Sequence, residues 1–123
     1  MSLICLEYKD FFDNNKEKKL EFSENLLLSS YNVKSLFALK VDGESMQPVI
    51  NDKALIVTDL SQKIIENESI YVVYNAGKMW VKKAIIDKNT TTFISINKKF
   101  AHLIFNEKDT RVLGKVLLTF TNL

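Results

Sequence analysis

Ser45 is the residue of this chain whose surroundings most suggest covalent chemistry. It follows Gly43 and precedes Pro48, the single proline, and the cluster comes directly after the apolar run 36–41. A turn of this composition can hold a serine hydroxyl clear of a sheet and leave nearby backbone N–H groups without ladder partners. The N–H groups of Glu44 and Ser45 could then stabilise an oxyanion. The same residues are also common turn formers, so their types alone leave a purely structural interpretation open.

A serine hydroxyl needs a base before it can act as a nucleophile at neutral pH. His102, the single histidine, is one candidate, but it lies in the apolar stretch 100–105, where a packed or surface histidine is the more common case. A lysine is the other candidate, because burial disfavours its charged form and lowers its pKa. Serine–lysine pairs are a known variant of the serine peptidase triad.

Two adjacent lysines in the stretch 79–86 could provide such a base. Alternation along a strand places Lys82 on one face with Trp80 and Ala84, and places Lys83 on the opposite face. An apolar face would desolvate Lys82 and lower its pKa. Both lysines could instead extend their amines to water from a half-buried strand. Alternation alone does not choose between the two lysines.

The elements that would position these side chains are rich in β-branched and aromatic residues, which favour strands. Strands are predicted over 36–41, 54–58, 70–74, 79–86, 91–96 and 112–121, the last interrupted at Gly114, with a hairpin turn over 75–78. Before them, residues 4–15 are predicted as a short strand or extended arm running into a turn. Residues 21–30 are predicted as a short helix with Ser23 as its N-cap. The expected fold is mostly β.

The composition fits one soluble globular domain. The chain has 123 residues, of which 46% are hydrophobic and 26% charged, and a net charge of +2; this is enough for a core of its own. The lysines are spread along the chain, so a DNA-binding face is not indicated. One cysteine, Cys5, excludes a disulfide framework and a cysteine-ligated zinc site and agrees with a reducing cytoplasmic location. Neither a membrane span nor a signal peptide is expected.

Two segments together resemble the LexA/UmuD/phage CI repressor peptidases. That family's nucleophile turn, Gly-x-Ser-Met-x-Pro, is matched by Gly43, Ser45, Met46 and Pro48. The stretch 80–83 is similar to the family's Val-Lys-Arg segment, whose lysine is the general base, and this implies Lys82 rather than Lys83. Weaker similarities cover 51–57, with Lys53 at or near a usual glycine, and the tail, where 97–100 is similar to the family's Asn-Pro-x-Tyr stretch and 111–116 to its closing strand. The resemblance covers about residues 36–121. The serine motif and the spaced lysine are specific together, and either alone would be weak.

The resemblance implies a compact antiparallel β domain with partly barrel-like sheets, related in fold to signal peptidases, that forms a homodimer. It implies that Ser45 attacks a peptide carbonyl while neutral Lys82 accepts its proton, without metal or cofactor. On this basis residues 31–123 are expected to form the peptidase and dimerisation domain. Residues 1–30 are expected to form an N-terminal arm, with a degenerate cleavage region and a short helix. The dimer is expected to use the strand 112–121.

The family's usual substrate is its own chain, cut between a small residue and a glycine upstream of the serine. In the family, a recombinase–DNA filament stimulates this cleavage after DNA damage. Here the only glycines are Gly43, Gly77 and Gly114, so the N-terminal arm holds none. The corresponding place is occupied by bulky residues in the segment 8–13. We therefore expect that the chain does not cut itself efficiently at this position.

Three functions compete. The first is the dimerising and latently self-cleaving C-terminal domain of a Cro/CI- or LexA-like repressor, whose helix-turn-helix domain, absent from this chain, binds operator DNA. The second is a UmuD-like accessory subunit of a translesion DNA polymerase, against which the missing cleavage dipeptide counts. The third is a signal peptidase, against which the lack of a membrane anchor argues. No small-molecule substrate and no membrane partner is expected for the first function.

Overall fold

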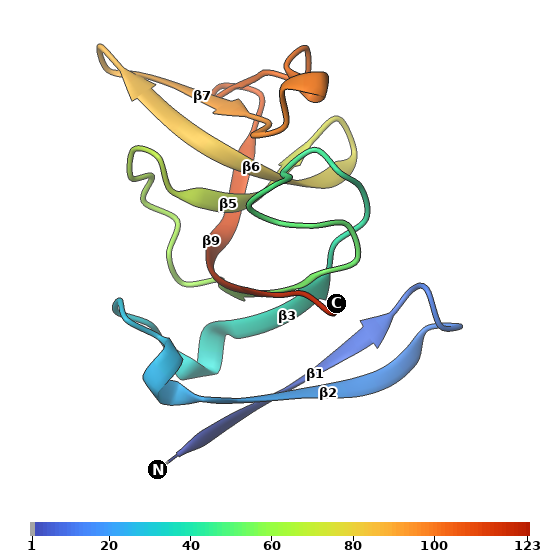
Figure 1. Cartoon of the computed structure of the whole chain (residues 1–123). Coiled ribbons are helices and arrows are strands. Elements are labelled where there is room, and N and C mark those ends of the chain that lie inside the picture. The colour runs from blue at the N-terminus through green and yellow to red at the C-terminus, as the bar shows by residue number, and fades with distance from the viewer. Residues whose placement is uncertain (1) are drawn as a thin grey trace.

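The computed structural model describes residues 2–123 and shows a mostly β protein built from antiparallel strands (Figure 1). Its strands are β1 (Leu3–Asp10), β2 (Lys16–Ser23), β3 (Leu36–Lys40), β4 (Leu55–Asp59), β5 (Ile70–Asn75), β6 (Lys78–Asp87), β7 (Thr90–Ile94), β8 (Phe105–Asn106) and β9 (Arg111–Phe120). Three 3₁₀ helices connect them: η1 (Glu24–Leu26), η2 (Val33–Ser35) and η3 (Lys98–Phe100). Over residues 2–123, no helix is long and apolar enough to cross a membrane. The predicted mostly β, antiparallel fold is confirmed.

Seven strands form one sheet in the order β3-β4-β9-β5-β6-β7-β8. Its outer strands, β3 and β8, do not pair with each other, so the sheet of the described residues is open and not a closed barrel. The last strand, β9, lies in the middle between β4 and β5. Because both edges of β9 are hydrogen-bonded within the chain, a dimer built on this strand would have to use one of its faces.

Strand β9 is continuous through Gly114, but its pairing with β5 shifts register there, so the predicted interruption is a register shift and not a break in the strand. The glycine is needed for another reason, which is the close approach of β4. A Cβ atom added at Gly114 would lie 2.7 Å from the backbone oxygen of Asp59 and 2.8 Å from the methyl group of Thr58. Contacts this short do not occur without a backbone shift, so only glycine fits.

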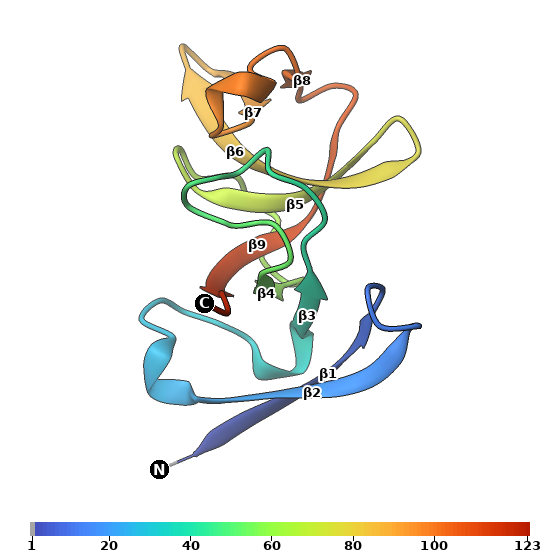
Figure 2. The ribbon, with the colours of Figure 1, turned by 45° about the vertical axis from the view of Figure 1, so that its right-hand side comes forward.

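The first two strands form a hairpin that lies across one end of the molecule, below β3 (Figures 1 and 2). The predicted N-terminal strand and its turn are confirmed, but the returning strand β2 was not predicted. The inner face of the hairpin carries Ile4 and Phe22, which join Leu36 and Val57 in a buried cluster. The outer face is charged, with opposite charges in register on the two strands: Glu7 faces Lys19, and Lys9 faces Glu17. Such cross-strand pairs favour the hairpin.

The predicted helix over residues 21–30 is wrong, because Lys16–Ser23 is strand β2 and only Glu24–Leu26 turn helically. Its predicted cap is present: the side chain of Ser23 accepts a hydrogen bond from the backbone N–H of Asn25 at 3.2 Å. The apolar residues after the cap do not continue the helix. Leu27 is extended, at φ −87° and ψ 101°, and its side chain joins the cluster under the hairpin. Tertiary packing therefore overrides the local helical preference.

Candidate functional site

Ser45 lies in the long loop between β3 and β4, and backbone hydrogen bonds close that loop at its base. The N–H of Val41 donates to the oxygen of Ala54 at 2.8 Å, and the N–H of Lys53 donates to the oxygen of Val41 at 2.8 Å. Lys53, at or near the glycine position of the resembling family, has a positive φ of 66°. The loop is therefore a fixed turn rather than a free excursion of the chain.

Two buried side chains anchor the turn that carries Ser45. Met46 and Ile50 are each 1% exposed and pack against Ile56 and Val72 of the sheet. Anchoring Met46 in the core keeps its neighbour Ser45 half-buried at the surface of the turn. The motif residue Met46 therefore has a physical role, because its buried side chain fixes the backbone next to Ser45.

Gly43 shapes the approach to the serine. Its φ of 115° lies in a region that only glycine adopts without strain, and its N–H donates to Oδ1 of Asp52 at 2.8 Å. The peptide bond between Gln47 and Pro48 is cis. Within residues 2–123, the backbone N–H groups of Glu44 and Ser45 donate to no protein acceptor. Those are the two donors predicted for an oxyanion.

Lys82 lies on β6 with none of its surface exposed, whereas Lys83 is half-buried. The Lys82 amine donates to Oγ of Ser95 at 2.7 Å and to the backbone oxygen of Leu103 at 2.7 Å. It also lies 4.6 Å from the ring centre of Phe105 and 5.5 Å from that of Trp80. Burial among these groups lowers the pKa of Lys82 from 10.5 to about 8. The structure thus separates two lysines that alternation could not.

The two acceptors around Lys82 suit a neutral amine. A neutral lysine has two N–H donors and one lone pair, whereas the charged form has three donors and no lone pair. Ser95 and Leu103 satisfy two donors. Among the described residues no carboxylate forms an ion pair with Lys82. In a neutral Lys82 the lone pair is not used by these two hydrogen bonds, so it remains available to accept a proton.

The segment that follows β7 contacts both the serine turn and the lysine. Asn97 donates from its backbone N–H to the oxygen of Ser45 at 2.9 Å and from Nδ2 to the oxygen of Glu44 at 2.9 Å. Two residues earlier, Ser95 accepts from Lys82. Because a peptide unit is planar, fixing the carbonyl of Glu44 also fixes the direction of the N–H of Ser45. Sequence reasoning did not single out Ser95 or Asn97 as site residues.

A cavity of about 710 Å³ opens beside Ser45, and we call it the Ser45 cavity. Its lining includes the turn residues Gly43 and Ser45, Trp80 of β6 and Leu103, whose backbone oxygen accepts from Lys82. No hydrogen bond among the described residues joins Ser45 Oγ to Lys82 Nζ. Ser45 and Lys82 therefore lie in one region, linked by Leu103 and the segment 95–97, but they are not hydrogen-bonded to each other.

His102, the alternative base, is exposed and does not line the Ser45 cavity. Its neighbours Phe100 and Leu103 do line it. A histidine open to water in this turn has no hydrogen bond that would orient it within the described residues. Lys82 does not line the cavity either, so the two candidate bases differ in burial: Lys82 has no exposed surface, whereas His102 is open to water.

Comparison with known proteins shows the family of this chain. The Peptidase S24-like family matches residues 3–117, which include the β1–β2 hairpin. The LexA repressor of Carboxydothermus hydrogenoformans is 32% identical over 118 residues, which are 93% of this chain and 54% of that repressor. An uncharacterized HTH-type transcriptional regulator of Haemophilus influenzae is 32% identical over 97 residues, 74% of this chain and 41% of that regulator. The chain spans about half the length of these curated relatives, and it belongs to the Peptidase S24-like family.

Proposed function

We propose that this chain is the peptidase domain of a LexA-like transcriptional repressor, with Ser45 as the nucleophile and Lys82 as the general base. One observation carries the proposal: Lys82 is fully buried, with a pKa lowered to about 8, in the strand whose Trp80 lines the Ser45 cavity. A buried lysine that is half neutral near pH 8 is a base suited to a serine hydroxyl. The similarity to LexA supports the same assignment.

In the proposed reaction, Ser45 Oγ attacks the carbonyl carbon of a peptide bond while the neutral Lys82 amine accepts the hydroxyl proton. The N–H groups of Glu44 and Ser45 hold the oxyanion that forms. The charged Lys82 then gives its proton to the leaving amine, and the C–N bond breaks. A water molecule, deprotonated by Lys82, then attacks the acyl-enzyme ester. The bond between the acyl carbon and Ser45 Oγ breaks, the new carboxyl terminus leaves, and Lys82 returns the proton to Ser45 Oγ.

We further propose that this domain is part of a longer transcriptional regulator. Its relatives are a repressor and an HTH-type regulator roughly twice as long as the chain. We propose that a helix-turn-helix domain outside this chain binds operator DNA, and that this domain pairs two copies in the cytoplasm. Linking two half-site contacts in a dimer raises the affinity for DNA through effective concentration. A recombinase filament is the proposed stimulus for cleavage.

The test of the peptidase assignment is covalent labelling with a serine-reactive phosphonate, mapped by mass spectrometry. We expect one phosphonate per chain, attached at Ser45, and none in Ser45→Ala. A folded protein that takes up no phosphonate between pH 7 and pH 10 would contradict the assignment and leave a dimerisation module.

A further inference from the structure

The turn of the β1–β2 hairpin forms part of the wall of the Ser45 cavity. Phe11, the first residue of that turn, lines the cavity and also lines a smaller groove of about 310 Å³ with Phe37 and Leu39 of β3. The hairpin turn and Ser45 therefore line the same cavity. A hairpin in this position can act either as the substrate of Ser45 or as a fixed side of the substrate site.

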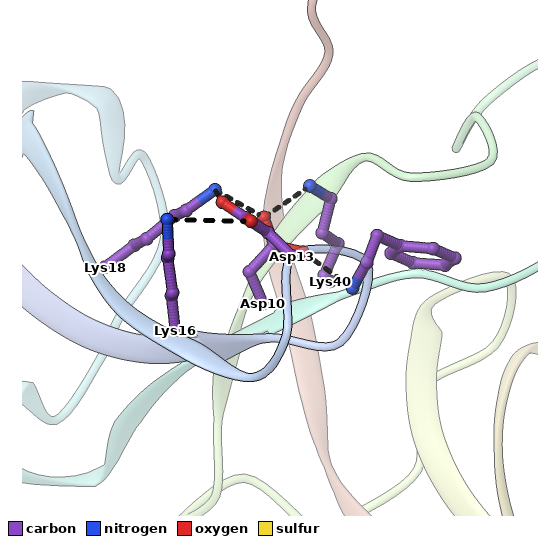
Figure 3. Close-up of polar contacts among 6 residues, drawn as sticks. Asp10, Asp13, Lys16, Lys18 and Lys40 are labelled. Atoms are coloured by element: carbon purple, nitrogen blue, oxygen red, sulfur yellow. Dashed lines mark hydrogen bonds and ion pairs between the residues drawn. The ribbon is translucent and has the colours of Figure 1, made fainter.

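The buried carboxylate of Asp10 ties the hairpin turn to the body of the domain (Figure 3). Asp10 is 1% exposed; its Oδ2 accepts from Lys18 at 2.8 Å and from Lys40 of β3 at 2.9 Å, and its Oδ1 accepts from the N–H of Phe12 at 3.0 Å. Lys18 also pairs with Asp13 at 3.0 Å. The two lysines hold the pKa of Asp10 well below its usual range, so these pairs persist near neutral pH.

The ring of Phe12 makes a second attachment, to two lysines outside the hairpin. Its centre lies 5.7 Å from the amine of Lys40 on β3 and 5.4 Å from that of Lys53 in the serine loop. Both distances suit a cation–π contact. To bring a peptide bond of the turn to Ser45, the chain would have to break these contacts and the buried Asp10 pairs together.

The strands of the hairpin are equally poor substrates. Every residue of β1 is paired in register with one of β2, from Leu3 with Ser23 to Asp10 with Lys16. Peptidases take their substrates as extended segments whose backbone is free to pair with the enzyme. Within the turn, Asn14 and Asn15 are left-handed, at φ 52° and 55°, which is not an extended conformation. The hairpin thus suits the role of wall and not that of substrate.

The Ser45 cavity itself has a definite chemical character. Its floor is apolar, with Val41, Met46 and Val72 among the lining residues. Its rim carries Asp42 and Glu44, both exposed and, among residues 2–123, both without an ion-pair partner. The one lysine of the lining, Lys40, is already paired with Asp10. The cavity therefore presents an apolar floor and an uncompensated negative rim.

We propose that the Ser45 cavity takes an extended segment of a second polypeptide chain, in which an apolar side chain enters the floor and Lys or Arg lies beside it. The β1–β2 hairpin is the fixed wall of this site. Cleavage of the bound segment by Ser45 and Lys82 rests on the proposed peptidase function. Binding of the segment does not, because it depends only on the apolar floor and the negative rim of the cavity.

The test measures binding to the Ser45→Ala variant of the full chain, so that no turnover intervenes. Two labelled ten-residue peptides each carry one leucine among alanines and serines, flanked by lysines in one and by glutamates in the other. We expect the lysine peptide to bind at least tenfold more tightly by fluorescence anisotropy. Adding Asp42→Asn with Glu44→Gln should remove most of this preference. Adding Asp87→Asn with Glu107→Gln, which removes two exposed carboxylates outside the cavity lining, should leave it unchanged.

Equal binding of the two peptides, or a cut within residues 8–15 of the wild-type chain itself, would overturn the inference. The peptidase assignment fails in a different way. If the protein binds the lysine peptide but is not labelled by the phosphonate, the proposed binding site is supported and the peptidase assignment is contradicted. If Ser45 is labelled but the two peptides bind equally, the peptidase assignment is supported and the proposed binding site is contradicted.

Discussion

The amine of Lys82 lies 2.7 Å from the hydroxyl oxygen of Ser95, across the pairing of β6 with β7. The register that pairs Lys83 with Ile94 places Ser95 opposite Lys82. Ser95 is 8% exposed, so its hydroxyl meets the lysine in a nearly dry environment. Because Lys82 is held there by Ser95 and by the oxygen of Leu103, the direction of its lone pair is set by these two neighbours. Ser95 is thus a positioning residue for the proposed base.

Ser95→Ala should slow phosphonate labelling of Ser45 roughly tenfold at pH 9, since a misdirected base loses part of the 10²–10⁴-fold contribution of proton transfer. Ser95→Thr keeps the hydroxyl and should restore most of the rate. The measurement is the labelling rate by mass spectrometry, with circular dichroism as the control for folding. An unchanged rate in Ser95→Ala would mean that the hydrogen bond is only structural.

The labelling rate should depend on pH through Lys82. Only the neutral amine accepts a proton, and burial lowers the pKa of Lys82 to about 8. The rate should therefore rise with pH, with a midpoint near pH 8, and level off by about pH 9–10. Rates measured from pH 6 to pH 10 test this, with Lys83→Met as a control that should keep the midpoint. A rate that is already constant below pH 7 would exclude Lys82 as the base.

Burial of Lys82 should also lower the free energy of unfolding at neutral pH, and Lys82→Met should raise it again. The folded pKa is about 8 and the reference value is 10.5, so below pH 8 the folded state carries a charge that burial disfavours. At about 1.4 kcal/mol per pKa unit, the cost is about 3 kcal/mol. The unfolded chain binds more protons between pH 8 and pH 10.5, so wild-type stability should rise across this window.

Urea unfolding of the two proteins at pH 7 and pH 10 measures this difference. Lys82→Met should be more stable than the wild type at pH 7, and the gap should shrink at pH 10. The opposite trend, with a gap that grows with pH, would mean that the lysine is held in its charged form.

Asp10→Asn should release the hairpin turn from β3. Loss of the carboxylate removes both lysine partners of Asp10, so amide hydrogen exchange in residues 11–18 should become at least tenfold faster. Asp13→Asn is the matched control, because Asp13 is more exposed and its Lys18 contact leaves the Asp10 pairs in place. In the wild type these pairs should begin to weaken only as the pH falls below about 4, and they should persist well below that value, because the two lysines hold the pKa of Asp10 well below its usual range. Equal exchange rates in the wild type, Asp10→Asn and Asp13→Asn would show that the Asp10 ion pairs do not hold the hairpin turn in place.

Six strands of the seven-stranded sheet were predictable from their β-branched and aromatic residues, whereas the two-residue strand β8 was not predicted. Strand β2 was not predictable either, because Lys16–Ser23 is rich in Lys and Glu, which disfavour strands in isolation, and only pairing with β1 makes it one. The choice between Lys82 and Lys83 needed either the family resemblance or the three-dimensional surroundings. The residues Ser95 and Asn97 could not be found from their types, since each acts on an atom far away in the sequence. The available signals were the position of Ser95 on the apolar face of a predicted strand and the weak similarity of the stretch 97–100 to the family.

The direct test of the proposed dyad compares Lys82→Met with Lys83→Met in phosphonate labelling at pH 9. Both variants remove one amine from the same strand, but only Lys82 is buried beside Ser95 and Leu103. We expect Lys82→Met to remain folded and to be labelled at Ser45 at least a hundredfold more slowly, while Lys83→Met is labelled at the wild-type rate. Labelling of Lys82→Met at the wild-type rate would contradict the proposed dyad and would require another base for Ser45.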